Sequence, residues 1–103
     1  TEGSIQEYRD FCFAVLARFG AKSAKAAPLM NRCITEGNWS DVHHIRNAIG
    51  ACKVIKALGP AAKECLPALE KAVQIEKFDD RIPAETVKRF KEEAQAALAA
   101  VKG

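Results

Sequence analysis

The chain carries one sequence unit twice, at an offset of 39 residues. The run VLARFG at residues 15–20, with Pro28 after it, matches the run VIKALG at residues 54–59, with Pro67 after it. Repeats of about 40 residues built from paired helical segments are typical of stacked helical hairpins, whose units cover one another's apolar faces. The repeat therefore predicts an all-α fold, a short α-solenoid of antiparallel helical hairpins.

The turn residues of this repeat predict where the helices begin and end. Gly20 and Gly59 each end a helix, because glycine readily adopts the left-handed conformation that closes one. Pro28 and Pro67 mark a bend or a helix start, because proline has no N–H and fits best in a first turn. Ser40 is a good N-cap for the third helix. We expect about five helices, over residues 4–19, 23–36, 41–58, 61–76 and 83–102.

The expected helices form two and a half repeats within a single domain. In the third unit Asp79 takes the place of Ser40 and is predicted to cap a helix. Two explanations of the incomplete third unit stay open: the chain is part of a longer array, or its last helix caps the stack with a polar outer face. The predicted divisions of the domain 1–103 are repeat one at about 4–39, repeat two at about 40–78, and a partial or capping repeat at about 79–103.

Apolar residues recur three or four positions apart in each expected helix and form one stripe, which is the predicted core. The stripes, in chain order, are Ile5, Tyr8, Cys12, Val15, Leu16 and Phe19; Leu29, Met30, Cys33 and Ile34; Val42, Ile45, Ile49, Cys52, Ile55 and Leu58; Leu66, Leu69, Val73 and Ile75; and Val87, Phe90, Ala94, Ala97, Leu98 and Val101.

The aromatic and histidine residues between the two units are predicted to have structural roles. Trp39 and Phe78 occupy equivalent positions of the repeat, so the fold requires an aromatic side chain in that turn. The neighbouring His43 and His44 point about 100° apart on a helix and are poorly placed to ligate one metal ion. With Ser40 as N-cap, Trp39 and His44 have the N′ and N4 positions of a hydrophobic staple.

The four cysteines, Cys12, Cys33, Cys52 and Cys65, have no close spacing such as C-x-x-C, so neither a zinc site nor a redox motif is predicted. We interpret them as small buried apolar residues. A disulfide between Cys12 and Cys33 is the alternative, because both are equally far from a turn near residues 22 and 23. No cofactor, metal ligand or catalytic residue is predicted.

Residues 58–73, LGPAAKECLPALEKAV, resemble the bacterial HEAT-like repeat of the type first described in phycobilisome lyases. The first unit, with Ala21 in place of the proline after glycine, is similar in a looser way, and both units together cover about residues 6–78. The resemblance implies two and a half HEAT-like repeats in a curved solenoid and a role as a protein-binding scaffold. HEAT-repeat metal-dependent hydroxylases carry adjacent His-Glu pairs, and no His in this chain is directly followed by a Glu, so this activity is not expected.

In HEAT arrays the second helices line the concave surface, which implies that their polar residues contact the partner. The candidate partner-binding residues, at equivalent positions of the two units, are Asn31, Arg32, Thr35, Glu70, Lys71 and Gln74. We therefore expect a non-enzymatic protein-interaction or scaffold module, a domain of a larger bacterial protein, whose partner is another protein.

Two other functions stay open. The chain is a self-association element if two copies cover the apolar surface at an exposed end of their helical stacks. A basic-surface nucleic-acid binder is the weaker alternative, because the net charge of +3 comes from interspersed residues of both signs. No membrane-spanning segment is predicted, since the longest uncharged apolar run, residues 11–17, is far shorter than the roughly 20 residues required. The cellular compartment stays open.

Overall fold

The computed structural model of the chain describes residues 2–36 and 38–103, with only the backbone described for residues 2–6 and 21–23. The described residues are 82% helical and contain no strand, which confirms the all-α prediction. The elements, in chain order, are α1 (Glu2–Phe19), the 3-10 segment η1 (Gly20–Ala26), α2 (Ala27–Thr35), α3 (Val42–Leu58), the 3-10 segment η2 (Gly59–Cys65), α4 (Leu66–Ala72) and α5 (Ala84–Lys102).

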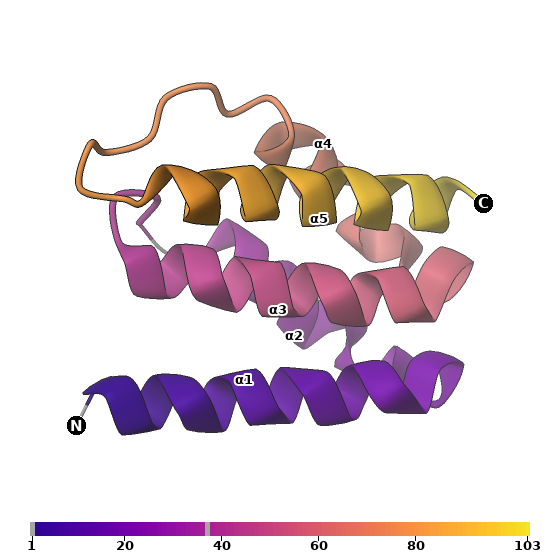
Figure 1. The fold of residues 1–103 in the computed structure, drawn as a ribbon. Coiled ribbons are helices and arrows are strands. Elements are labelled where there is room, and N and C mark those ends of the chain that lie inside the picture. Colours follow the sequence, from indigo (N-terminus) through magenta and orange to yellow (C-terminus); the bar gives the residue numbers. More distant parts are fainter. Residues whose placement is uncertain (1, 37) are drawn as a thin grey trace.

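The helices form two layers. α1, α3 and α5 lie side by side and run in the same direction, and α2 and α4 lie behind them as a second layer (Figure 1). The second-layer helices pack mainly on the next first-layer helix, α2 on α3 and α4 on α5. Among the residues that the structure describes fully, no Cα atom of α1 lies within 8 Å of one in α2. α1 is therefore an edge helix that packs on α3 and η1.

The two repeated segments have the same local conformation. Gly20 and Gly59 have positive φ angles of 55° and 60°, and a 3-10 segment follows each glycine. Pro28 and Pro67 then lie in the first turn of α2 and of α4. The expected bend or helix start at Pro28 and Pro67 is therefore confirmed, because each proline lacks the N–H that would extend a single α-helical ladder through it. The α-helices themselves are shorter than the expected ranges 23–36 and 61–76.

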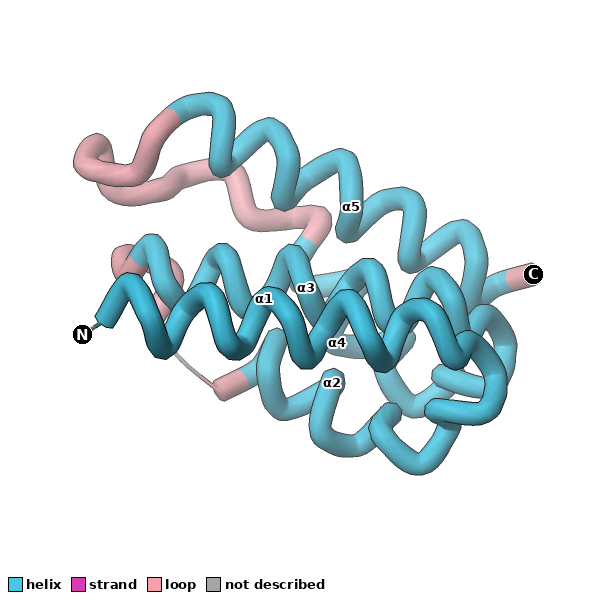
Figure 2. The backbone as a smooth tube through the Cα atoms, turned by 60° about the horizontal axis from the view of Figure 1, so that its bottom comes forward, coloured by secondary structure: helices cyan, strands magenta, loops and turns pink. Residues whose placement is uncertain are grey.

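The capping residues differ from the prediction in two places. Asp41, not Ser40, is the N-cap of α3, and its carboxylate accepts a hydrogen bond from the His43 backbone N–H at 2.9 Å. Asp79 does not cap a helix. Its carboxylate accepts from the Arg81 backbone N–H at 2.9 Å, within the long loop that leads to α5 (Figure 2). Pro83 holds the N-cap position of α5 and begins the helix with its fixed φ angle.

The core lies around α3, which has neighbours on three sides. The stripe predicted for this helix is confirmed for Ile45, Ile49, Cys52, Ile55 and Leu58, which are all buried, while Val42 at its start is half-buried. The other buried residues include Ile82 of the loop before α5 and, in the other elements, Met30, Ile34, Ala62, Leu69, Phe90, Ala94, Ala97 and Val101.

Three residues of the predicted core are exposed instead. Tyr8 and Phe19 of α1 are 70% and 59% exposed, because no second-layer helix covers α1 as α2 covers α3. Leu29 of α2 is 54% exposed, beside the space between α1 and α2. Ile5, also predicted to be in the core, lies outside the described side chains.

Candidate functional site

The six predicted partner-binding residues lie on the second layer, and we call them the second-helix strip. α2 buries Ala27, Met30 and Ile34 against the core, so its intervening positions face away from it. α4 in the same way buries Ala68, Leu69 and Ala72. Arg32, Thr35, Glu70, Lys71 and Gln74 are exposed and Asn31 is half-buried. Because α2 and α4 are in contact, the strip extends over two neighbouring helices.

One member of the strip lies outside the helix predicted for it. α4 ends at Ala72, and the Gln74 backbone N–H donates to the Lys71 carbonyl at 3.2 Å in the turn that follows. Thr35, its equivalent, is the last residue of α2, and its hydroxyl donates to the Asn31 carbonyl at 3.0 Å. The strip therefore ends at the last residue of α2 and in the turn that follows α4.

The charges of the strip are of both signs and solvent-exposed. The Arg32 Nε atom lies 3.2 Å from the Glu36 carboxylate, one helical turn away, with both side chains about two-thirds exposed. Such exposed pairs contribute little to stability, typically about 0.3–0.5 kcal/mol on a helix. Glu70 and Lys71 form no ion pair with any other described residue. The strip can therefore offer donors and charges to a polar protein surface with little internal rearrangement.

A cavity of about 470 Å³ adjoins the strip, in the space that separates α1 from α2. Arg32 and Cys33 of α2 and Glu36, the residue after α2, contribute to it on one side, and Arg9 and Phe13 of α1 on the other. The sequence reasoning missed this cavity because it assumed that the helices of the first hairpin pack closely. No pattern in the residues distinguishes a close hairpin from an open one.

His44 also lines this cavity, within a cluster of rings. It is 8% exposed, and its Nε2 atom has no hydrogen-bond partner among the described residues. Burial lowers the pKa of His44 from its ordinary value, with the nearby Asp41 acting in the opposite direction. The ring lies in an edge arrangement with that of Trp39, 4.4 Å between centroids. The predicted Trp39–His44 contact is confirmed, although Asp41 rather than Ser40 is the cap.

The repeated aromatic residues meet on α5. Trp39 and Phe78 lie 5.1 Å and 6.0 Å from the buried Phe90 ring, centroid to centroid. These two equivalent residues therefore fix the start of α5 against both preceding loops, as the repeat predicts for packed aromatic residues.

All four cysteines are free thiols. Burial is the main cause that raises the pKa of Cys52 to about 12 and that of Cys65 to about 11. The predicted alternative of a disulfide between Cys12 and Cys33 does not fit the structure. They lie on α1 and α2, whose Cα atoms are all more than 8 Å apart, whereas disulfides require about 4.4–6.8 Å.

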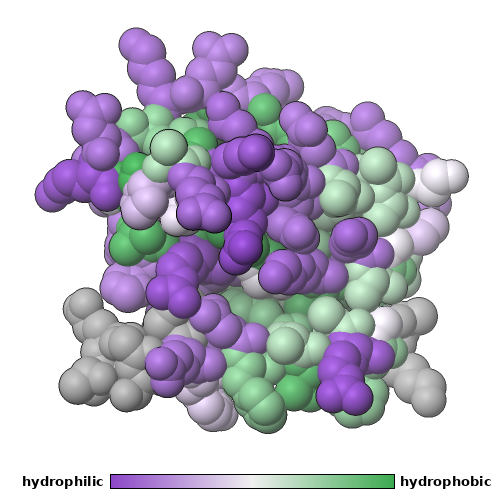
Figure 3. All heavy atoms as spheres, in the orientation of Figure 1, coloured by the Kyte–Doolittle hydropathy of each residue, from purple (hydrophilic) through white to green (hydrophobic). Residues whose placement is uncertain are grey.

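Three of the four large apolar residues that are exposed in the described chain lie on α1. Tyr8 and Phe11 are 70% and 66% exposed, and Phe19 lies further along the same helix. α5, at the opposite edge of the layer, has no large exposed apolar residue in the described chain. Figure 3 shows hydrophilic side chains over the α5 side and more apolar ones over the α1 side. The two edges of the layer therefore differ in chemistry.

Within the described chain, no three His, Cys, Asp or Glu side chains are grouped so that they could hold a metal ion. Among the same residues, none of the helices has the combined length and apolarity that a bilayer crossing requires. Comparison with protein-family models, with curated proteins and with solved structures finds no match to this chain.

Proposed function

We propose that the chain is a non-enzymatic protein-interaction module, built as a short α-solenoid of HEAT-like hairpins, and that it binds a partner protein through the second-helix strip. It acts as a domain of a larger bacterial protein. The observation that carries this proposal is the repeated polar surface. Residues 31, 32 and 35 and their equivalents 70, 71 and 74 are polar in both units and lie on the neighbouring helices α2 and α4 or, for Gln74, in the turn that follows α4.

The matching backbone of the two units supports the solenoid architecture. Gly20 and Gly59 share a left-handed conformation, and each leads through a 3-10 segment to a helix with proline in its first turn. Units of this kind stack because each buries its apolar face against the next one. The contacts of α2 with α3 and α4 support this proposal.

A photo-crosslinking amino acid at the strip tests the proposed binding surface. It replaces Thr35 in one variant and Gln74 in another, because both side chains are exposed at the ends of the strip. A third variant carries it at Gln95, an exposed residue of α5, as the matched control. We expect the same protein to be crosslinked from both strip positions and not from Gln95. Equal crosslinking from Gln95, or different proteins from the two strip positions, contradicts the proposal.

A second function, self-association, is favoured by the exposed aromatic residues of α1. Aromatic side chains are enriched at protein interfaces, and Tyr8 and Phe11 lie three residues apart on one face of the helix. The polar outer face of α5 offers no matching apolar surface for a head-to-tail stack. We infer that self-association joins α1 of one copy to α1 of another, in a closed symmetric dimer.

Light scattering coupled to size-exclusion chromatography tests this second function over a tenfold range of concentration. A dimer that forms with increasing concentration and is lost in Phe11→Glu supports it. Gln95→Glu adds the same charge at the opposite edge of the layer and is expected to leave the dimer intact. A monomer at every concentration contradicts self-association and leaves the proposal for the second-helix strip unaffected.

A further inference from the structure

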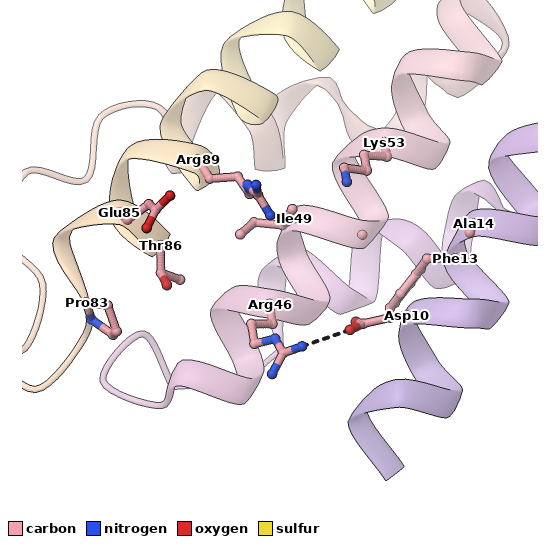
Figure 4. A pocket seen from close by; sticks show the side chains of 11 residues that line it. Asp10, Phe13, Ala14, Arg46, Ile49, Lys53, Pro83, Glu85, Thr86 and Arg89 are labelled. Atoms are coloured by element: carbon pink, nitrogen blue, oxygen red, sulfur yellow. Dashed lines mark hydrogen bonds and ion pairs between the residues drawn. The ribbon is translucent and has the colours of Figure 1, made fainter. Parts of the chain in front are cut away.

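A groove crosses the first layer of helices, between α1 and α5 with α3 as its floor (Figure 4). It forms because, in the fully described part of α1, no Cα atom lies within 8 Å of one in α5, so the surface of α3 stays open between them. The volume of the groove is about 430 Å³, within the range of roughly 300–1,000 Å³ that is usual for ligand sites. Its described lining includes no residue of α2 or α4, so it is separate from the second-helix strip.

The floor of the groove combines cationic and apolar side chains. Arg46, Ile49 and Lys53 share one face of α3, since they lie three, four and seven residues apart. They span about 10 Å along the helix axis at 1.5 Å per residue. Phe13 of α1 and Pro83, just before α5, add apolar surface on the two walls.

The cations of the groove are only partly neutralised by the protein itself. Arg46 lies 2.9 Å from the Asp10 carboxylate, and both side chains are a little under half exposed. Lys53 and Arg89 form no ion pair with any described residue. They extend from α3 and α5 toward Ile49 at the centre of the groove (Figure 4). The lining holds three cationic residues and two acidic ones, Asp10 and Glu85, so one positive charge is in excess.

We propose that this groove binds an acidic segment of a partner protein, with its carboxylates on Lys53 and Arg89 and an apolar side chain over Phe13 and Ile49. Arginine and lysine form strong charge-assisted hydrogen bonds with carboxylates. The apolar surface of Phe13 and Ile49 can pack against an apolar side chain of a peptide, whereas a phosphate backbone gains nothing from it. These features favour an acidic peptide over a nucleic acid. This site goes beyond the proposed strip and gives the module a second binding surface.

Fluorescence anisotropy with a labelled peptide of alternating Glu and Leu residues tests the proposal on the full chain. A second peptide, with Gln in place of each Glu, measures the contribution of the carboxylates. We expect the Glu peptide to bind at least about tenfold more tightly than the Gln peptide, with the difference decreasing as salt is added. Equal affinities for the two peptides, or no binding of either, would overturn the proposal.

Charge reversals show whether the peptide binds in the groove. Lys53→Glu and Arg89→Glu are each expected to weaken the Glu peptide by about tenfold. Lys56→Glu and Lys88→Glu make the same change at exposed positions of α3 and α5 outside the groove and are expected to leave the affinity within about twofold.

Circular dichroism verifies that all four variants fold. Equal losses in groove and control variants would overturn the proposal, since they would indicate a general charge effect. A DNA duplex that displaces the peptide and depends on the same two cations would also overturn it, in favour of nucleic acid.

Discussion

Gly50 is buried in the middle of α3, where alanine would ordinarily be the better residue. Glycine in a helix interior costs about 0.8–1 kcal/mol relative to alanine. A Cβ atom at this position would lie 2.6 Å from Cγ and 3.0 Å from Cβ of Phe13 on α1. These atoms are fixed close to the backbone of α1, so rotation of the ring does not relieve the overlap. α1 itself must move, or Phe13 must change its χ1 rotamer.

We therefore expect Gly50→Ala to destabilise the protein, against the usual direction of this substitution in helices. Overpacking of a core contact costs about 1–3 kcal/mol, from which the gain in helix propensity of about 0.8–1 kcal/mol is subtracted. The net loss is about 1 kcal/mol, which corresponds to a fall in Tm of about 4–8 °C for a domain of this size.

Urea unfolding of four proteins measures this effect: the unmodified chain, Gly50→Ala, Phe13→Ala and the double variant. In the Phe13→Ala background the overlap is absent, so Gly50→Ala is expected to stabilise by about 0.8–1 kcal/mol. The coupling free energy is then about 1–3 kcal/mol. If Gly50→Ala stabilises both backgrounds equally, the close packing of α1 on α3 at this point is refuted.

Three other predictions follow from the titratable groups. Burial lowers the pKa of His44 below its ordinary 6.5, so as the pH falls the imidazole is protonated in the unfolded chain before it is protonated in the folded one, and the free energy of unfolding decreases below about pH 6.5. Urea unfolding at about pH 7.5 and about pH 5.5 measures this decrease, which is expected to be smaller in His44→Phe. In the native protein a thiol reagent is expected to modify the half-buried Cys12 and Cys33 much faster than the buried Cys52 and Cys65, which become reactive only in denaturant. Equal modification rates for all four cysteines contradict the buried positions of Cys52 and Cys65. Hydrogen bonds from the side chain and the backbone N–H of Arg81 lower the pKa of Asp79 to about 2. An NMR titration is expected to give a midpoint there in the unmodified chain and a higher one in Arg81→Gln, which loses the guanidinium but keeps the backbone N–H, and identical midpoints argue against the side-chain pairing.

The repeat made much of the fold predictable. Gly20 and Gly59 end their helices as expected because a positive φ angle is a local property of glycine that needs no knowledge of the neighbours. The stripe of α3 was likewise predictable, since a central helix with neighbours on several sides buries most of the apolar positions in its stripe. The same spacing failed for Tyr8 and Phe19, because an apolar stripe does not tell whether a neighbouring helix is present to cover it.

Two other predictions were wrong: the N-cap residue of α3, where two adjacent residues suit the position, and the disulfide, which depends on the distance between α1 and α2. Ser40 and Asp41 are adjacent and both suit an N-cap, and the hydrogen bond to the His43 N–H decides for Asp41. Cys12 and Cys33 were candidates for a disulfide only on the assumption that α1 and α2 pack together.

The candidate site was predictable in part. The strip residues could be listed from the repeat, because exposed positions of a helix are the complement of its buried ones. The groove between α1 and α5 could not be predicted, because it depends on the distance between these two helices where both pack on α3.

The affinity of the second-helix strip for the partner crosslinked through Thr35 and Gln74 would decide whether that surface carries the function. Isothermal titration calorimetry would compare the unmodified chain with Arg32→Glu/Lys71→Glu and with the control Lys56→Glu, all at exposed positions. Binding through the strip predicts a loss of at least about tenfold in the double variant and a change within about twofold in the control. An unchanged dissociation constant in a folded double variant would contradict it.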